Sequence, residues 1–431
     1  MKIFNNLESE VRSYCRSFPV IFSAANGAWL EDTEGSQYLD FFAGAGALNY
    51  GHNDPDMIAA VIKYLKNDGL LHSLDLHSTT KANFLHTFET LILQPRQLDY
   101  KVQFTAPTGS DAVEAAIKLA RKSTGRSTIA CFTGGYHGMS LGALSLTANP
   151  EKRGLAGISI PGIMRLPYEN FLELSTLEQL NVIESMLTKP GAGSDLPAAF
   201  IIECVQGEGG LNAISKQWAQ GVAQLAKEIG ALLIVDDIQA GCGRTGNFFS
   251  FESLGIKPDI VCLSKSLSGL GLPFSVNLVS RSQDCWSAGE HIGTFRGNNL
   301  AMVSATVALQ KYWSNDSLTS TTLIREKQAR VQLASCIESA QQHNIKVVGR
   351  GMMMGLHFGI HGLAEKASKE LFKHNLIAET CGAQNEILKL MPPLTIKSEE
   401  FQKGLKLVAD VSIELAKKHQ DTKEVISCSL V

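Results

Sequence analysis

Short apolar runs alternate with amphipathic segments along most of the chain. We predict strands at 101–104, 128–132, 198–203, 231–236, 259–263 and 275–278, and a helix over 111–124. This alternation is typical of α/β layers around a mainly parallel sheet. Such sheets bind their ligands at the carboxyl ends of the strands, so functional side chains are expected directly after each apolar run.

The two ends of the chain have a different pattern. Residues 28–41 are typical of two strands around an acidic glycine turn. Beyond about 315, the pattern predicts a helix over 323–343, strands at 345–348 and 355–359, and two further helices. The predicted parts are a large domain, 53–315; a smaller α/β domain built from both termini, 1–52 and 316–420; and a flexible tail, 421–431.

The composition is that of an ordinary globular protein. Of its 431 residues, 44% are hydrophobic and 19% are charged. The formal net charge is −3 and the pI is near 6.4. Because no basic field is available for a polyanion, we expect small-molecule substrates and neither nucleic acid nor a membrane surface as a partner.

The cysteines and the N-terminus indicate the cellular compartment in which the protein is expected. Nine cysteines are scattered without a Cys-x-x-Cys pair, which argues against a disulfide framework and against a zinc site. The polar N-terminus has no apolar signal core, and no apolar stretch approaches the ~20 residues of a membrane span. We therefore expect a cytoplasmic protein that holds no metal.

A lysine and a carboxylate give the clearest chemical signal. Lys265 follows the apolar run 259–263 and lies 29 positions after Asp236, which closes the run 231–236. Pyridoxal phosphate chemistry needs an amine that holds the aldehyde of the cofactor, and a buried carboxylate that keeps its pyridine nitrogen protonated. The pair predicts a pyridoxal phosphate enzyme, with Lys265 as the catalytic residue and Asp236 at the ring nitrogen.

Two glycine-containing segments offer further cofactor contacts. Gly109 and Ser110 precede a strong helix, where free backbone N–H groups and the helix dipole favour a phosphate. Taken alone, a Gly-Ser helix start is more often a capping device than a phosphate site. Because Lys265 occurs in the same chain, we favour the phosphate site here. Tyr136 and His137 stand among glycines that let a ring approach a planar cofactor, and we assign the stacking to Tyr136.

Three other polar residues are candidates for the same site. Gln239 is placed to reach the phenolic oxygen of the cofactor. Thr294 offers a hydroxyl that completes the phosphate site across a subunit boundary. Glu203 ends the run 198–203 among glycines, where it is either only solvated or bound to the second amine of a substrate.

Together these segments resemble the class III (omega) aminotransferases of the fold-type I pyridoxal phosphate enzymes. The shared features are the Gly-Ser turn, the aromatic-His-Gly triplet 136–138, the segment 236–246 and the lysine, and their order and spacing match across most of the chain. The chain departs at Asp237 for the usual Glu. The resemblance implies a homodimer or a dimer of dimers, in which Thr294 acts on the site of the partner.

A narrower resemblance spans about 4 to 415, through the segments 7–16, 41–52, 294–299 and 379–383, and points to a subgroup of ectoine biosynthesis. It implies reversible transfer of the terminal amine of L-2,4-diaminobutyrate to 2-oxoglutarate, giving L-aspartate 4-semialdehyde and L-glutamate.

One departure bears on the substrate. Many class III enzymes have a carboxylate-binding arginine where this chain has Lys389, and a lysine binds carboxylate only as a point charge. Arg296 is therefore a second candidate for a substrate carboxylate. Glu203 is the candidate partner of a gated basic group that lets one pocket accept both a diamine and a dicarboxylate.

Three alternatives stay open. An aminotransferase for ornithine, 4-aminobutyrate or a related diamine would carry the same cofactor residues. A non-catalytic scaffold of the same fold is the second alternative, but every predicted cofactor contact is present and a scaffold would usually have lost some of them. A dinucleotide oxidoreductase is suggested only by Gly44-Ala45-Gly46, and Asn49 stands where the third glycine is required.

Overall fold

A seven-stranded sheet forms the centre of the large domain of the computed structural model, which describes residues 1–154, 162–339 and 345–428. Its order is β4 (Tyr100–Phe104), β10 (Val276–Ser280), β9 (Ile260–Leu263), β8 (Leu232–Asp236), β7 (Ala199–Ile202), β5 (Ile129–Phe132) and β6 (Ile163–Leu166). Only β10 runs antiparallel to its neighbours. The predicted α/β class, the mainly parallel sheet and all six predicted strands are confirmed, and β6 is an additional strand.

Apolar side chains cover both faces of this sheet. Phe200 and Val235 belong to one buried cluster, whereas Ile201 and Ile234 belong to another. Successive residues of a strand point to opposite faces, so strands buried on both faces need continuous apolar runs. The helices of the large domain are α4 (Pro55–Lys66), α5 (Thr79–Phe88), α6 (Gly109–Thr124), α7 (Leu141–Leu146), α8 (Pro150–Gly154), α9 (Thr176–Thr188), α10 (Lys216–Ile229) and α11 (Asn299–Tyr312).

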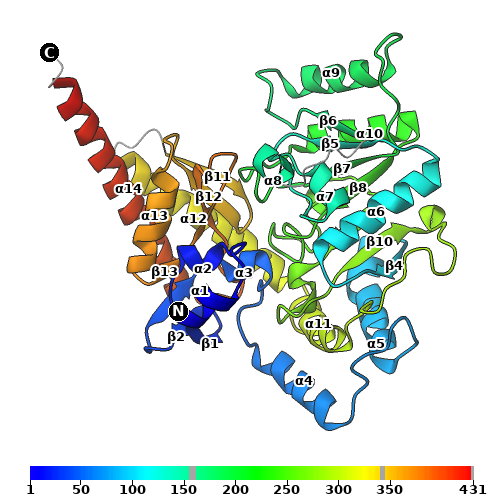
Figure 1. Cartoon of the computed structure of the whole chain (residues 1–431), viewed down its shortest axis with the longest axis horizontal. Helices are drawn as coiled ribbons and strands as arrows, with labels where there is room; N and C mark the ends of the chain where they lie inside the picture. The colour runs from blue at the N-terminus through cyan, green and yellow to red at the C-terminus, as the bar shows by residue number, and fades with distance from the viewer. Residues whose placement is uncertain (155–161, 340–344, 429–431) are drawn as a thin grey trace.

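The smaller α/β domain is built from both termini, which Figure 1 shows at the left in blue and in orange to red. One sheet joins β1 (Phe22–Asn26), β2 (Trp29–Asp32) and β3 (Gln37–Asp40) to β13 (Leu376–Ile377), and Leu376 pairs with Leu39. The other sheet has the order β11 (Lys346–Arg350), β12 (Met353–His357), β15 (Ile387–Leu390) and β14 (Glu379–Cys381). Its long helices are α12 (Ser317–Ser339), α13 (Leu363–Lys373) and α14 (Ser398–Cys428).

Two predicted segments extend beyond the described residues. The helix predicted over 323–343 corresponds to α12, and its positions 340–343 lie outside the described range. Residues 421–428, predicted as a tail, continue α14, while 429–431 lie outside that range. The domain boundaries after 52 and 315 stay predictions.

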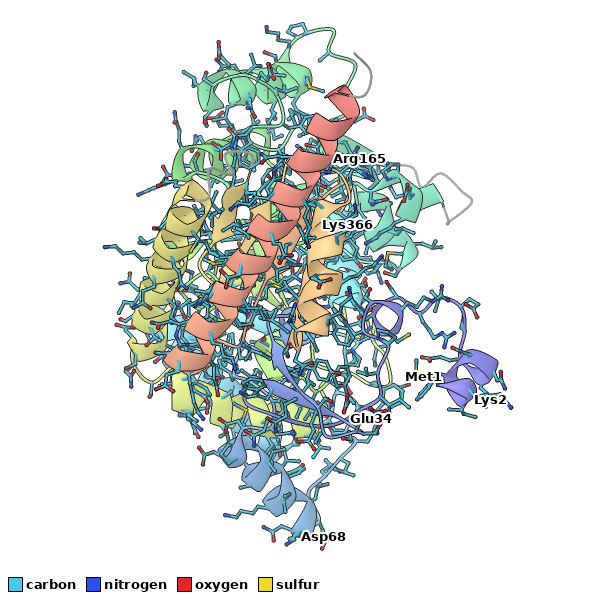
Figure 2. All side chains as sticks on the ribbon, turned by 90° about the vertical axis from the view of Figure 1, so that its left-hand side faces the viewer. Met1, Lys2, Glu34, Asp68, Arg165 and Lys366 are labelled. Carbon is cyan, nitrogen blue, oxygen red and sulfur yellow. The ribbon has the colours of Figure 1, made fainter. Side chains whose placement is uncertain are left out.

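The first residues of the chain lie apart from its body, as the labels of Met1 and Lys2 in Figure 2 show. The helix α1 (Lys2–Leu7) buries none of its residues, and α2 (Tyr14–Ser17) follows it. Within the described ranges, no helix is both long and apolar enough to cross a membrane.

The buried Arg244 joins three distant parts of the chain. Its guanidinium donates to Asn49 Oδ1 at 2.5 and 3.1 Å, to the carbonyl of Met352 at 3.2 Å and to the carbonyl of Pro392 at 2.6 Å. Asn49 Nδ2 in turn donates to the carbonyl of Cys242 at 2.9 Å. The planar arrangement of donors on one guanidinium thus fixes the N-terminal segment and two parts of the smaller domain against the large domain.

We expect Arg244→Lys to destabilise the protein by about 3 kcal/mol, because the bonds to Asn49, Met352 and Pro392 come from three guanidinium nitrogens. A single ammonium nitrogen cannot lie within reach of all three residues and leaves buried carbonyls unpaired. Chemical unfolding of the purified protein measures this change. Arg281→Lys is the control, since Arg281 makes an exposed ion pair with Asp99. Equal unfolding curves for the two variants would contradict the role of Arg244.

Candidate active site

The carboxyl ends of five strands meet at one edge of the large sheet. β5, β7, β8 and β9 are parallel, and β4 runs in the same direction because both β4 and β9 are antiparallel to β10. The residues after these strands line a cavity of about 270 Å³. Eight predicted site residues lie on its wall: Gly109, Ser110, Tyr136, His137, Glu203, Asp236, Gln239 and Lys265.

A buried carboxylate and imidazole lie on one side of the cavity. Asp236, the last residue of β8, has its Oδ2 at 2.8 Å from His137 Nδ1, and both side chains are almost fully buried. Burial opposes the charged imidazole, but the hydrogen bond and charge of Asp236 raise the pKa of His137 above its usual value. The hydrogen bond therefore holds the Asp236 carboxylate at a fixed place in the wall. His137 contacts Asp236 as a positioning residue.

Lys265 has a strained backbone at the start of a 3-10 turn, η4 (Lys265–Ser268). Its φ is 49°, in the left-handed region that residues with a side chain rarely adopt. Its ammonium donates to the carbonyl of Ala45 at 2.8 Å. Burial, followed by the positive charge of Lys389, lowers the pKa of Lys265 to about 8. The site thus holds an amine whose neutral, nucleophilic form is far more abundant near physiological pH than that of an ordinary lysine.

The N-terminus of α6 forms another part of the wall. Thr108 caps this helix by accepting from the amide of Asp111 at 3.3 Å, which leaves the first-turn N–H groups of Gly109 and Ser110 without partners inside the helix. A Cβ at Gly138 would lie 2.2 Å from Ser110 Oγ, so only glycine lets the 136–138 turn approach this helix end. The arrangement is suited to an anion such as a phosphate.

Glu203 is a buried carboxylate that accepts from two backbone amides. Its oxygens lie 2.9 Å from the amide of Tyr136 and 3.1 Å from the amide of Gly207. Burial, partly offset by His137, raises the pKa of Glu203 to about 7. Its contacts fix the turn that carries Tyr136, whose backbone is thereby positioned at the cavity.

Lys389 lies behind the cavity wall and is surrounded by acceptors. Its fully buried ammonium donates to Glu208 Oε1 at 2.9 Å and Gln239 Oε1 at 3.0 Å, and forms an ion pair with Glu379 at 3.2 Å. Burial opposes its charge, but the two carboxylates raise the pKa of Lys389 well above its usual range. The structure therefore places Glu208 and Glu379 against Lys389, while Glu203 contacts amides.

The two remaining candidates lie outside this cavity. Arg296 forms an ion pair with Asp111 in the first turn of α6, and it lines a separate cavity together with His291 and Lys81. Thr294 is exposed. In one chain, neither residue faces the cavity that holds Lys265.

Among the residues of the cavity wall that were not predicted as site residues are Tyr14, Ala45, Lys152 and Glu208. Glu208 follows Glu203 in the same glycine-rich segment, which is a signal that could have identified it. Lys152, in the short helix α8, and Tyr14, in α2, come from segments whose patterns carry no chemical signal.

Comparisons with known proteins agree with this geometry. The family model "Aminotransferase class-III" matches residues 12–411. The chain belongs to the class III aminotransferases. Its cofactor is pyridoxal phosphate, and its reaction is transamination.

Two relatives and one solved structure show the extent of the likeness. A protein of Halalkalibacterium halodurans named diaminobutyrate–2-oxoglutarate transaminase is 49% identical over 99% of this chain and 98% of its own length. A protein of the same name from Vibrio parahaemolyticus is 48% identical over 97% and 99%. The crystal structure of ornithine aminotransferase from Toxoplasma gondii matches with a TM-score of 0.83 at 24% identity, covering 97% of this chain and 95% of that one.

The cavity fits pyridoxal phosphate in its chemical groups. An amine with a lowered pKa, a buried carboxylate and an anion-binding helix end open into one space. We predict that Gly109 and Ser110 hold the phosphate, Asp236 the ring nitrogen and Lys265 the aldehyde carbon, with Tyr136 at the face of the ring. Gln239 stays the candidate for the phenolic oxygen.

The pKa of Lys265 leads to a prediction about pH. Only the neutral amine attacks an aldehyde, so the rate of covalent incorporation of pyridoxal phosphate into the cofactor-free protein should rise with pH and level off above about 8. Absorbance after rapid mixing measures this rate, and Lys265→Ala should show no covalent incorporation. A midpoint near the ordinary lysine value of about 10.5 would contradict the lowered pKa.

Proposed function

We propose that this aminotransferase moves the terminal amine of L-2,4-diaminobutyrate to 2-oxoglutarate, giving L-aspartate 4-semialdehyde and L-glutamate. Two relatives with nearly half of their residues identical over almost the whole chain bear the name of this activity. The product would enter the synthesis of ectoine or of another compound derived from diaminobutyrate. Residence in the cytoplasm stays a prediction of the sequence.

The observation that carries the proposal is the acidic wall beside Lys265. Glu208 lines the cavity, while its partner Lys389 is fully buried behind it. Burial raises the pKa of Glu379. Burial also opposes the charge of Glu208, but Lys389 and Lys265 lower the pKa of Glu208 to about 2, so Glu208 presents a negative charge to the cavity. A wall of this charge attracts the second amine of a diamine substrate.

The pair of Glu208 and Lys389 also explains how one cavity accepts a dicarboxylate. A carboxylate of glutamate or 2-oxoglutarate is repelled by Glu208 as long as this side chain faces the cavity. Rotation of Glu208 away from Lys389 would expose a permanent positive charge to the substrate. We therefore assign the gating role to Glu208 and Lys389, in place of the partner Glu203 that the sequence suggested.

Each half of the reaction uses the same groups of the chain. Pyridoxal phosphate, when bound, withdraws electrons from the carbon that bears the reacting amine. Asp236 retains the proton on the ring nitrogen that makes this withdrawal strong. The amine of Lys265 removes the proton from the substrate carbon as a base and delivers it as an acid, and the second half of the cycle reverses these transfers.

An exposed apolar surface supports association of two chains. We call it the 70–76/292–295 surface; its exposed apolar members are Leu70, Leu71, Leu74, Leu76, Ile292 and Phe295. The two segments touch, since the rings of His72 and Phe295 meet edge to face at 5.5 Å. Burial of this surface in a homodimer would bring Thr294, which lies within it, to the site of the partner subunit.

The substrate is tested by adding L-2,4-diaminobutyrate, L-ornithine, 4-aminobutyrate and L-glutamate separately to the cofactor-loaded protein and recording the cofactor absorbance. We expect rapid conversion by diaminobutyrate and glutamate only, and none in Lys265→Ala because proton transfer is lost. Rapid conversion by ornithine or 4-aminobutyrate with none by diaminobutyrate would replace the substrate and leave the mechanism in place.

The oligomer is tested with Phe295→Glu, which introduces a charge into the 70–76/292–295 surface. We expect the variant to sediment as a monomer and to lose most of its activity, since burying an unpaired carboxylate costs several kcal/mol. Ile324→Glu is the control, because Ile324 is similarly exposed but lies on α12. A monomeric wild-type protein with full activity would contradict the proposal.

A further inference from the structure

The cavity wall carries a cation whose role the reaction described so far does not require. Lys152, in α8, lines the cavity together with Tyr136 and Glu208. Its ammonium lies 4.8 Å from the centre of the Tyr136 ring. Among the residues that the structure describes, no carboxylate is within ion-pair distance of this ammonium. Lys152 is therefore free to bind an anion that enters the cavity.

The other basic groups of the region are already engaged. Lys265 is reserved for the cofactor and for proton transfer. Lys389 is enclosed by two carboxylates and the oxygen of Gln239. Arg296 is paired with Asp111 and faces a different cavity. Of the described residues on the cavity wall, only Lys152 and Lys265 are cations, so Lys152 is the one left for the substrate.

The carboxylates of the cavity wall also differ in whether their charge is available to a ligand. Asp236 is hydrogen-bonded to His137, and Glu203 accepts hydrogen bonds from two backbone amides. Glu208 instead shares its charge between Lys389 and the cavity. The positive charge of Lys152 is close enough to contribute to the lowered pKa of Glu208, after the larger effects of Lys389 and Lys265. A cation and an anion thus stand near each other on one part of the wall.

We infer that Lys152 and Glu208 form a subsite for the amino acid end of the substrate, in which Lys152 binds the α-carboxylate and Glu208 the α-ammonium. This inference rests on the proposed function. It names the residues that bind the α-amino acid end of diaminobutyrate, which is remote from the reacting amine. The subsite distinguishes an α-amino acid from a simple diamine through Lys152. It distinguishes diaminobutyrate from 4-aminobutyrate, which lacks the α-ammonium, through Glu208.

A pair of substrates isolates the role of Lys152. L-2,4-diaminobutyrate and 1,3-diaminopropane differ only by the carboxylate. In Lys152→Gln, we expect the KM for diaminobutyrate to rise by about tenfold to a hundredfold, the loss of one charge-assisted contact. The KM for 1,3-diaminopropane should stay within about twofold, because this substrate makes no such contact. Lys152→Arg should restore most of the affinity for diaminobutyrate.

A second measurement is independent of turnover. Calorimetry gives the Kd of diaminobutyrate for cofactor-loaded Lys265→Ala, in which proton transfer is blocked, and for the double variant with Lys152→Gln. We expect the double variant to bind at least about tenfold more weakly. Arg153→Gln in the same background is the matched control, because it removes the same charge one residue further along α8 and does not line the cavity.

The outcomes separate this inference from the proposed function. Equal losses for diaminobutyrate and 1,3-diaminopropane, or an unchanged Kd in the double variant, would overturn the subsite while leaving the reaction intact. If the wild type converts ornithine and not diaminobutyrate, the proposed function fails. The subsite is then decided by the same comparison between ornithine and 1,4-diaminobutane, which again differ only by the carboxylate.

Discussion

The parallel register of β7, β8 and β9 is the constraint on which the active site depends. Ile202 pairs with Val235, and Asp236 pairs with Cys262. This register fixes Glu203, the residue after β7, and Lys265, two residues after the end of β9, relative to Asp236. A slip by one residue would turn every side chain of a strand to the opposite face. Because the two faces bury separate apolar clusters, the packing that stabilises the sheet also fixes the distances between the functional groups.

The two buried lysines show how the surroundings give one residue type opposite properties. Burial disfavours the charge of both Lys265 and Lys389. Carboxylates at 2.9 and 3.2 Å reverse this effect at Lys389, which stays a permanent cation. Among the described residues, Lys265 has one hydrogen-bond partner, the carbonyl of Ala45, so burial and the repulsive charge of Lys389 lower its pKa. The permanent cation thus helps to keep the neighbouring amine reactive.

The sequence predicts those parts of the molecule that local patterns determine. Asp236 and Lys265 could be found because each follows an apolar run that has to be a buried strand. β6 was missed because Arg165 interrupts its short apolar run. The partners of Lys389 could not be predicted, since Glu208 lies 181 positions away and only the packing of two domains brings them together. Lys152 was missed for the same reason, because α8 reaches the cavity through tertiary structure alone.

The lysine at 389 fits its surroundings better than an arginine would. An ammonium directs three donors to separate acceptors, and here the acceptors are oxygens of Glu208, Gln239 and Glu379. A planar guanidinium would instead favour two parallel bonds to one carboxylate. Held by Lys389, Gln239 donates to the carbonyl of Ala45 at 3.0 Å, the same oxygen that accepts from Lys265. The choice of lysine therefore connects the substrate-facing carboxylate to the catalytic amine through one carbonyl of the N-terminal segment.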